Sequence, residues 1–138
     1  MGNGYAGKVL MVNLTDSSWR DLVLDEQDLK KYIGGSCLSA KLYLDRYNLE
    51  ADPLSEENPL MIMTGPMVGS GFPGTSRFSI CAKAPQTGIW GESACGGTFG
   101  PELKRAGYDG IIFEGKSPSP VYLSLVDGQV QLLDASAL

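Results

Sequence analysis

The stretch of sequence that decides the fold is KVLMVNLTDSSWRDLVL, residues 8–24. Lys8–Leu14 is rich in residues that favour extended backbone, and Trp19–Leu24 is a second candidate strand. Between them, Thr15–Ser18 has the short polar side chains that are typical of a turn. The sequence therefore predicts a β-hairpin near the start of the chain.

A helix is predicted directly after this hairpin. Asp25 has the side chain of a helix N-cap, and Leu29 and Ile33 recur at the spacing of one helical face. Gly34–Gly35 interrupts the pattern, after which helical periodicity resumes as far as Tyr47. The resumed helix offers a free N-terminus to a ligand, but a kink that lets two segments pack closely is the simpler account.

The rest of the chain predicts mainly strands. Short apolar or alternating runs indicate strands at Leu60–Thr64, Arg77–Lys83, Ile89–Ser93, Asp109–Glu114, Val121–Val126 and Gln129–Asp134. One short helix is predicted at Pro101–Ala106, with proline in its first turn and Gly107 just past its end. Asp127-Gly128 is a strong signal for a two-residue hairpin turn. The expected fold class is α+β, and it is rich in sheet.

The chain contains a weak internal repeat. The hairpin of residues 8–24 leads into a helix, and the hairpin of residues 121–134 is similar but has no helix after it. We therefore expect two similar hairpin/helix repeats, of which the second is incomplete, within a single domain over residues 1–138. On this interpretation the domain is truncated.

The composition is that of one packed domain, with 43% hydrophobic and 20% charged residues among 138. The net charge is −5 without a block of either sign, which argues against nucleic acid or a membrane surface as partners. Neither a run of about 20 apolar residues nor a signal-peptide pattern is present, so a cytoplasmic location is expected. Cys37, Cys81 and Cys95 form no Cys-x-x-Cys pair and are expected to be reduced and buried.

The absence of histidine limits the chemistry of the chain. It excludes Ser-His and Cys-His nucleophile pairs and the usual imidazole-rich zinc sites, and it removes the commonest general base near neutral pH. Any chemistry must therefore come from a bound cofactor or from carboxylates. We assign no catalytic side chain.

Gly69–Gly74 matches the G-x-G-x-x-G pattern of dinucleotide-binding sites. Such a site needs a helix that begins at the glycines, and Pro73 and the strand predicted at Arg77–Lys83 do not permit one there. A kinase glycine loop, with Lys83 on the next strand, would need His-Arg-Asp and Asp-Phe-Gly motifs, which the sequence lacks. Nucleotide binding is therefore not predicted.

A second glycine turn is the better candidate for a ligand site. Cys95-Gly96-Gly97 precedes the predicted short helix, and glycines leave backbone N–H groups uncovered for an anion. Arg77, beside a flexible loop, has the geometry for a bidentate phosphate contact. The alternatives are a glycine turn that only packs and an arginine that is solvated or salt-bridged. Catalysis by Cys95 is not indicated because no base accompanies it.

Many short motifs in one order carry a family resemblance that covers nearly the whole chain. They are Gly4–Lys8, Asn13–Thr15, Tyr32–Gly35, Asp52–Ser55, Thr64–Pro66, Arg77, Lys83–Gly88, Gly96–Asp109, Glu114–Lys116 and Pro120–Tyr122. In this order the chain resembles the N-terminal domain of the tungsten-containing aldehyde:ferredoxin oxidoreductase family. Each motif alone is weak, and their common order makes the resemblance specific.

The resemblance implies a tungstopterin, in which two pterin dithiolenes hold tungsten or molybdenum, together with magnesium and a [4Fe–4S] cluster in the complete enzyme. Arg77 corresponds to an arginine that contacts a pterin phosphate. Ala94 corresponds to a residue, often asparagine, whose backbone carbonyl binds the magnesium, and any residue supplies such a carbonyl. Gly96 and Gly97 correspond to backbone contacts with the pterin, and Cys95 lies in the same cofactor-binding turn.

The implied function is oxidation of a small aldehyde to a carboxylate with electrons passed to ferredoxin, and this domain would cradle the pterin. The helical domains and cluster cysteines of the family lie outside these 138 residues. The chain alone is therefore expected to be inactive, to retain no cofactor and to associate with itself. Two alternatives stay open: a relative of the catalytic subunit of aromatic acyl-CoA reductases, and a non-catalytic β-rich interaction domain.

Overall fold

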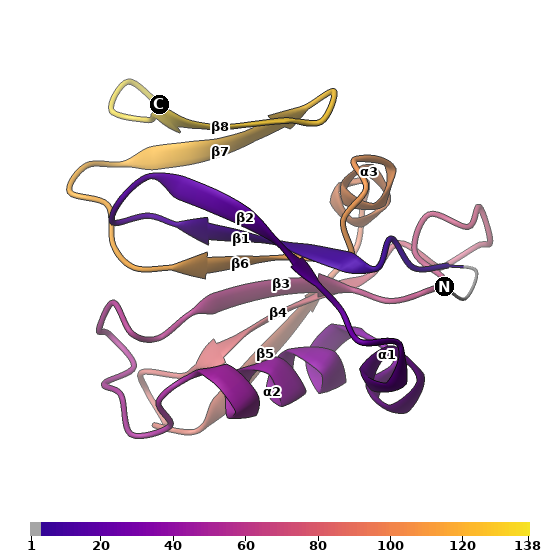
Figure 1. The fold of residues 1–138 in the computed structure, drawn as a ribbon, viewed down its shortest axis with the longest axis horizontal. Coiled ribbons are helices and arrows are strands. Elements are labelled where there is room, and N and C mark those ends of the chain that lie inside the picture. Colours follow the sequence, from indigo (N-terminus) through magenta and orange to yellow (C-terminus); the bar gives the residue numbers. More distant parts are fainter. Residues whose placement is uncertain (1–3) are drawn as a thin grey trace.

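A computed structural model describes residues 4–138, within which there are three helices and eight strands (Figure 1). The strands are β1 (Lys8–Asn13), β2 (Ser18–Val23), β3 (Leu60–Thr64), β4 (Phe78–Lys83), β5 (Trp90–Cys95), β6 (Gly110–Glu114), β7 (Val121–Val126) and β8 (Gln129–Asp134). The helices are α1 (Glu26–Tyr32), α2 (Gly35–Arg46) and α3 (Phe99–Arg105). None of these helices is long and apolar enough to cross a lipid bilayer. The expected α+β class, rich in sheet, is confirmed.

Six strands form one sheet in the order β2-β1-β6-β3-β4-β5, and β7 and β8 form a separate two-stranded sheet. β1 lies inside the larger sheet, antiparallel to β2 and parallel to β6. Its residues Val9–Val12 are at most 3% exposed. Because both faces of β1 are covered, its sequence is a continuous apolar run and not an alternating one.

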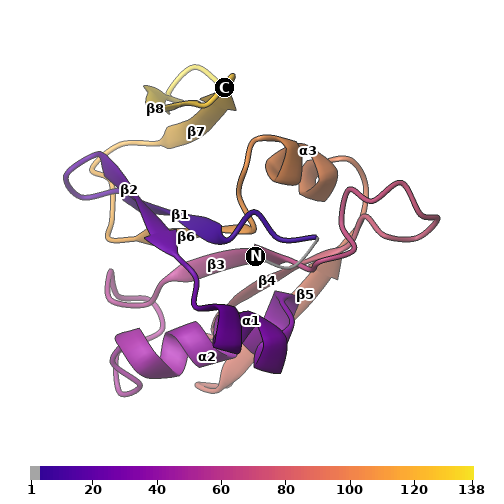
Figure 2. The same cartoon turned by 45° about the vertical axis from the view of Figure 1, so that its right-hand side comes forward.

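Each face of the large sheet is covered by a different layer. α1 and α2 pack on one face, and α3 and the β7–β8 hairpin lie over the other (Figures 1 and 2). Successive side chains of a strand point to opposite faces, so β1 contributes to two apolar cores. Met11 packs in the core that contains Leu38 of α2. Leu10 and Val12 pack in the core that contains Leu103 of α3.

The break between α1 and α2 is sharper than a kink. After Tyr32, Ile33 adopts φ +66° and ψ −62°, and the Gly34 N–H donates to the Tyr32 carbonyl at 2.7 Å. This γ-turn is strained for a β-branched residue. Ile33 is 59% exposed and Leu29 is 3% exposed, so the prediction that the two side chains lie on one helical face is wrong. The chain must turn here because Gly34 packs closely, and a Cβ on it would lie 2.6 Å from the Thr64 carbonyl oxygen.

The prediction that all three cysteines are buried is wrong for two of them. Cys81 lies in the core beneath α2, where burial raises the pKa of its thiol. Cys37 and Cys95 are exposed. Cys37 lies in the first turn of α2 and Cys95 ends an edge strand, and at both places few elements cover the side chain. All three are free thiols, as expected.

The second hairpin forms as predicted. Asp127 and Gly128 have φ of +50° and +77°, which are the positive values that a type I′ turn requires. β7 and β8 pair over their full lengths, from Val121 opposite Asp134 to Val126 opposite Gln129. Local turn chemistry was thus sufficient to place this hairpin.

Gly110, at the start of β6, offers a test of the packing at the centre of the sheet. A Cβ there would clash with the Met63 sulfur and would lie 2.6 Å from the Ile62 carbonyl oxygen. We expect Gly110→Ala to lower the free energy of unfolding by about 2–3 kcal/mol, because the sheet backbone cannot move away. Denaturant unfolding measures this. Gly65→Ala is the control, since no atom lies within 4 Å of a Cβ there, and an equal loss in both variants would contradict the packing account.

Candidate functional site

Glycine-rich segments converge at one end of the large sheet. β3 and β5 end there, and β4 begins there. α2 and α3 also begin at this end, on opposite faces of the sheet (Figure 1). Two loops, residues 65–77 and 96–98, connect these elements. This region is called the loop end below.

The 65–77 loop is held against α3 by close backbone packing. A Cβ at Gly69 would lie 3.6 Å from the Cβ of Lys104, and a Cβ at Gly100 would lie 2.9 Å from the Ser76 carbonyl oxygen. The loop contains turns and bends, with no helix at its glycines, before it enters β4. This arrangement confirms the prediction that no helix begins at the glycines of its G-x-G-x-x-G pattern.

Arg77 ends this loop, directly before β4. Its side chain is exposed, and it takes part in none of the ion pairs or side-chain hydrogen bonds found among residues 4–138. Residues 65–76 carry no charge, so Arg77 is the cation of this loop. Of the two alternatives to a phosphate contact, a solvated arginine and a salt-bridged one, the structure shows the solvated one. The guanidinium of Arg77 is therefore available to an anion at the loop end.

The Ala94 carbonyl lies outside the hydrogen-bond ladder of the sheet. Antiparallel residue pairs alternate between those that exchange hydrogen bonds and those that do not. The N–H and carbonyl of Lys83 bond to the side chain of Asn58, at 3.1 and 2.9 Å, so its pair with Trp90 is of the second kind. Four residues further on, the pair of Ser79 with Ala94 is of the same kind. Because β5 is an edge strand, the Ala94 carbonyl faces the open edge.

The turn after β5 presents bare backbone. Gly97 has φ +94°, which favours glycine, and no heavy atom lies within 4 Å of the position of a Cβ there. Gly96 is more enclosed, since a Cβ there would lie 3.8 Å from the Ser76 hydroxyl. The Cys95 thiol donates to the carbonyl oxygen of the neighbouring Gly96 at 3.5 Å.

The structure brings the predicted site residues together at the loop end. Phe78, the first residue of β4, pairs with Cys95, the last residue of β5. Arg77 and Gly96 therefore continue from the facing ends of two neighbouring strands, and Ala94 lies one residue inside the edge strand. This places a cation, a free carbonyl and an open glycine turn in one region.

The N-terminal segment of residues 4–7, called the strap below, also lies at the loop end. The N–H groups of Ala6 and Gly7 donate to the two carboxylate oxygens of Asp109, at 3.1 and 2.6 Å. Lys104 forms an ion pair with the same carboxylate, and the two side chains are only 10% and 3% exposed. The sequence patterns placed Lys104 in a helix and Asp109 in a strand but did not indicate this cluster. The signal available in the sequence was Asp109 itself, a single carboxylate directly before the apolar strand β6.

Tyr5 extends the strap to the other helical layer. Its hydroxyl donates to the carbonyl oxygens of Ile33, at 2.8 Å, and Leu29, at 3.3 Å. Burial and the nearby charge of Asp109 raise the pKa of Tyr5 above its ordinary value. The hydroxyl therefore stays protonated and remains a donor at neutral pH.

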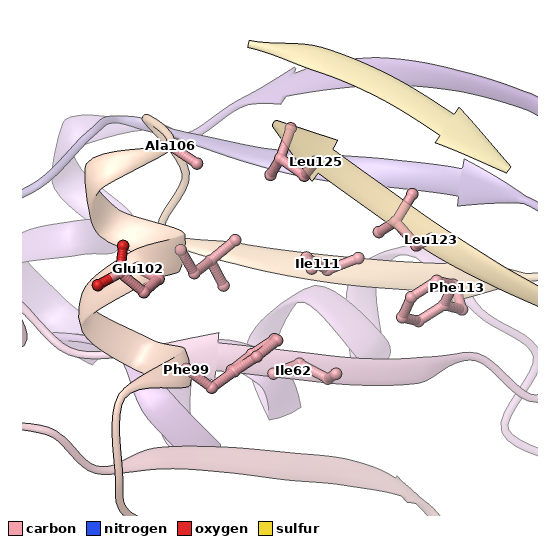
Figure 3. Close-up of a pocket in the computed structure, with 9 residues that line it drawn as sticks. Ile62, Phe99, Glu102, Ala106, Ile111, Phe113, Leu123 and Leu125 are labelled. Carbon is pink, nitrogen blue, oxygen red and sulfur yellow. The ribbon is translucent and has the colours of Figure 1, made fainter. Parts of the chain in front are cut away.

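An apolar cavity of about 390 Å³ lies between α3, the sheet and β7 (Figure 3). It is lined by Ile62, Phe99, Glu102, Leu103, Ala106, Ile111, Phe113, Leu123 and Leu125. The ionisable residue of this lining is Glu102, and its carboxylate forms an ion pair with Arg105. The cavity therefore lacks the groups that bind phosphate or a metal, and it is not part of the candidate site.

Within residues 4–138 no group of three or more Asp, Glu, Cys or His side chains is placed to hold a metal ion. A metal ion at the loop end would take its ligands from a bound molecule and from main-chain oxygens. The outward carbonyl of Ala94 is such an oxygen.

Comparison with known proteins gives consistent matches over nearly the whole chain. The family profile described as "Aldehyde ferredoxin oxidoreductase, N-terminal domain" matches residues 9–138. The tungsten-containing aldehyde ferredoxin oxidoreductase of Pyrococcus abyssi is 41% identical over 133 residues, which are 96% of this chain and 22% of that protein. The aliphatic sulfonate oxidoreductase, WOR-like subunit, of Pyrococcus furiosus is 43% identical over 136 residues, covering 96% of this chain and 21% of that protein.

A solved structure agrees with these sequence matches. The active-site complex BamBC of benzoyl coenzyme A reductase, in complex with 1,5-dienoyl-CoA, matches with a TM-score of 0.95 and 40% identity, over 99% of this chain and 21% of that chain. The chain thus spans about a fifth of the length of the relatives it matches. Fold, motif order and sequence identity together show that the chain belongs to the aldehyde ferredoxin oxidoreductase family and corresponds to its N-terminal domain.

Proposed function

We propose that this domain cradles a tungsten- or molybdenum-pterin cofactor in an oxidoreductase. The observation that carries the proposal is the convergence at the loop end of Arg77, the outward carbonyl of Ala94 and the open backbone of Gly97. These groups suit a ligand that bears phosphate and magnesium. The tungsten-containing relatives favour a metal-pterin over other phosphate-bearing ligands.

Each group fits one part of such a cofactor. The guanidinium of Arg77 forms strong, bidentate hydrogen bonds with a phosphate. Magnesium binds hard oxygen ligands, carbonyl oxygens among them, so the Ala94 carbonyl would bind a magnesium ion carried by the cofactor. Gly96 and Gly97 would let the pterin approach the main chain, and Cys95 belongs to the same turn.

The metal-pterin, when bound, supplies the redox chemistry, because its metal exchanges two electrons with the substrate. The residues of this domain bind and orient it. Arg77 would hold a phosphate in place, and the 65–77 loop would shield one side of the cofactor from water. No side chain of this chain is assigned a catalytic role.

The complete enzyme is proposed to convert an aldehyde and water to a carboxylate and to pass two electrons through a [4Fe–4S] cluster to ferredoxin in the cytoplasm. The names of the aldehyde ferredoxin oxidoreductase relatives support this reaction. Over this domain, however, the sulfonate oxidoreductase and the benzoyl coenzyme A reductase are as similar, at 43% and 40% identity. We therefore assign cofactor binding, which such relatives would share, to this domain. The choice of substrate is assigned to other parts of the complete enzyme. An aromatic acyl-CoA reductase is the alternative.

Metal and pterin analysis of the protein expressed from its complete gene tests the proposal. We expect tungsten or molybdenum with two pterins per metal, and magnesium. A folded protein without pterin would instead be a non-catalytic domain, whereas a panel of aldehydes, sulfonates and aromatic acyl-CoA thioesters would identify the substrate. The 138-residue chain alone is expected to retain no metal and to show no activity, because it provides only one wall of the site.

In the protein expressed from its complete gene, Arg77→Gln should lower retained pterin roughly 10-fold or more, since a hydrogen bond to a charged group contributes about 1.5–3 kcal/mol. The free energy of unfolding should change by less than about 0.5 kcal/mol, because the side chain is exposed. Pterin content after dialysis measures the effect. Arg46→Gln, at the opposite end of α2, is the control, and equal pterin content in Arg77→Gln and the parent would refute the assignment.

Gly97→Val should destabilise the fold by about 1–3 kcal/mol, because valine is strained at positive φ, and should also abolish pterin retention. Gly88→Val is the matched control. Gly88 also has positive φ, +70°, and no atom within 4 Å of a Cβ, but it lies in the turn between β4 and β5 at the other end of these strands. Both variants should lose similar stability by denaturant unfolding, and only Gly97→Val should lose pterin. If Gly97→Val keeps its pterin, Gly97 is only a loop residue.

A further inference from the structure

Asp109 is a buried charged residue at the head of β6, and each of its polar groups is bonded. Its carboxylate accepts the N–H groups of the strap, as described above, and its own N–H donates to the Lys8 carbonyl at 2.8 Å. Its carbonyl accepts hydrogen bonds from the N–H and the hydroxyl of Thr64, at 2.9 and 2.7 Å. A buried carboxylate needs a cation and hydrogen-bond donors, and Lys104 is that cation. Asp109 thus joins β1, β3, β6, α3 and the strap.

Lys104 connects the strap to the 65–77 loop. The stem of its side chain packs beneath Gly69, and its ammonium group donates to the Gly4 carbonyl at 2.6 Å. Gly4 has φ +106°, and a Cβ on it would lie 2.6 Å from the Pro66 carbonyl oxygen. The strap therefore lies directly against the first residues of the loop that ends in Arg77.

Tyr5 connects the strap to the turn that precedes α2. Its hydroxyl bonds to the carbonyl of Ile33 within the strained γ-turn, and the Lys104 ammonium lies 5.5 Å from the centre of its ring. Strained backbone persists only where its surroundings hold it. Here the surroundings are the Tyr5 hydroxyl and the contact of Gly34 with Thr64. The strap thus reaches both faces of the sheet at the loop end.

We infer that Lys104, Asp109 and Tyr5 are positioning residues, which act through the strap to hold the Arg77 loop and the turn before α2 in fixed places on the two faces of the sheet. The identity of the ligand that binds between these segments rests on the proposed function. The coupling of the loop and the turn through the strap does not. A site whose walls are already placed loses less conformational entropy when its ligand binds. The strap is the element that keeps these walls in place.

Amide hydrogen exchange tests the coupling without any cofactor. The protein is expressed from its complete gene in medium that lacks tungsten and molybdenum. The reporters are the hydrogen-bonded amides of Val68 in the loop and Ile33 in the turn, and the reference is the core amide of Ile112. The charge-neutral double variant Lys104→Met/Asp109→Asn should accelerate exchange at both reporters at least 10-fold relative to the reference.

The single variant Tyr5→Phe keeps the ion pair and removes only the bond to the turn. It should accelerate exchange at Ile33 at least 5-fold and leave Val68 unchanged. Lys104→Arg retains a cation and should stay within 3-fold of the parent at both reporters. Arg105→Met, which breaks an exposed ion pair on the same helix, is the matched control and should change neither.

Uniform acceleration of all three amides in the double variant, or of both reporters in Tyr5→Phe, would show a purely stabilising role and overturn the inference. Unchanged reporters would overturn it as well. Pterin content of the same variants, expressed with tungsten, separates the two proposals. A parent without pterin refutes the proposed function and leaves the coupling intact. If the parent protein contains pterin and the double variant retains all of it, the strap does not help to position the cofactor.

Discussion

The buried carboxylate of Asp109 is the constraint on which the arrangement of the loop end depends. A charge removed from water must be paired, and breaking such a pair leaves an uncompensated charge that costs about 3–5 kcal/mol. Lys104 and the strap N–H groups meet this demand only if α3, β6 and residues 4–7 lie where they do. Non-directional apolar packing fills the two cores, but this directional cluster sets the relative positions of the segments around the site.

The glycines of this region serve two different ends, which their surroundings distinguish. Gly34 and Gly100 lie within 3 Å of neighbouring backbone oxygens once a Cβ is added, so they allow α2 and α3 to approach the sheet and the loop. No heavy atom lies within 4 Å of a Cβ on Gly97, so its positive φ, and not close packing, is what favours glycine there. A close-packed glycine is part of the fold, whereas the open backbone of Gly97 leaves room for the ligand of the proposed function.

Local signals sufficed for the elements but not for their interactions. The valine-rich β1, the Asp25 cap and the Asp127-Gly128 turn were predictable because each acts through neighbours within a few residues. The strap was missed because its bonds to Asp109 join residues 102 and 103 positions apart. The break at Gly34-Gly35 was predicted, but the strained turn at Ile33 was not, because tertiary contacts override helical periodicity there. The site residues came from family motifs, and the outward direction of the Ala94 carbonyl required the strand register.

The charge of these 138 residues favours a magnesium ion in the proposed cradle. With a net charge of −5 the domain has no long-range field that attracts an anionic cofactor, so neutralisation must be local. Two phosphates would carry a charge of about −3 to −4. Arg77 and a divalent magnesium ion would together supply about +3 to balance it. Arg77 alone would leave most of that charge uncompensated beside an acidic protein. A main-chain carbonyl is a suitable protein ligand for this ion, because a carboxylate in its place would add to the charge that the ion must balance.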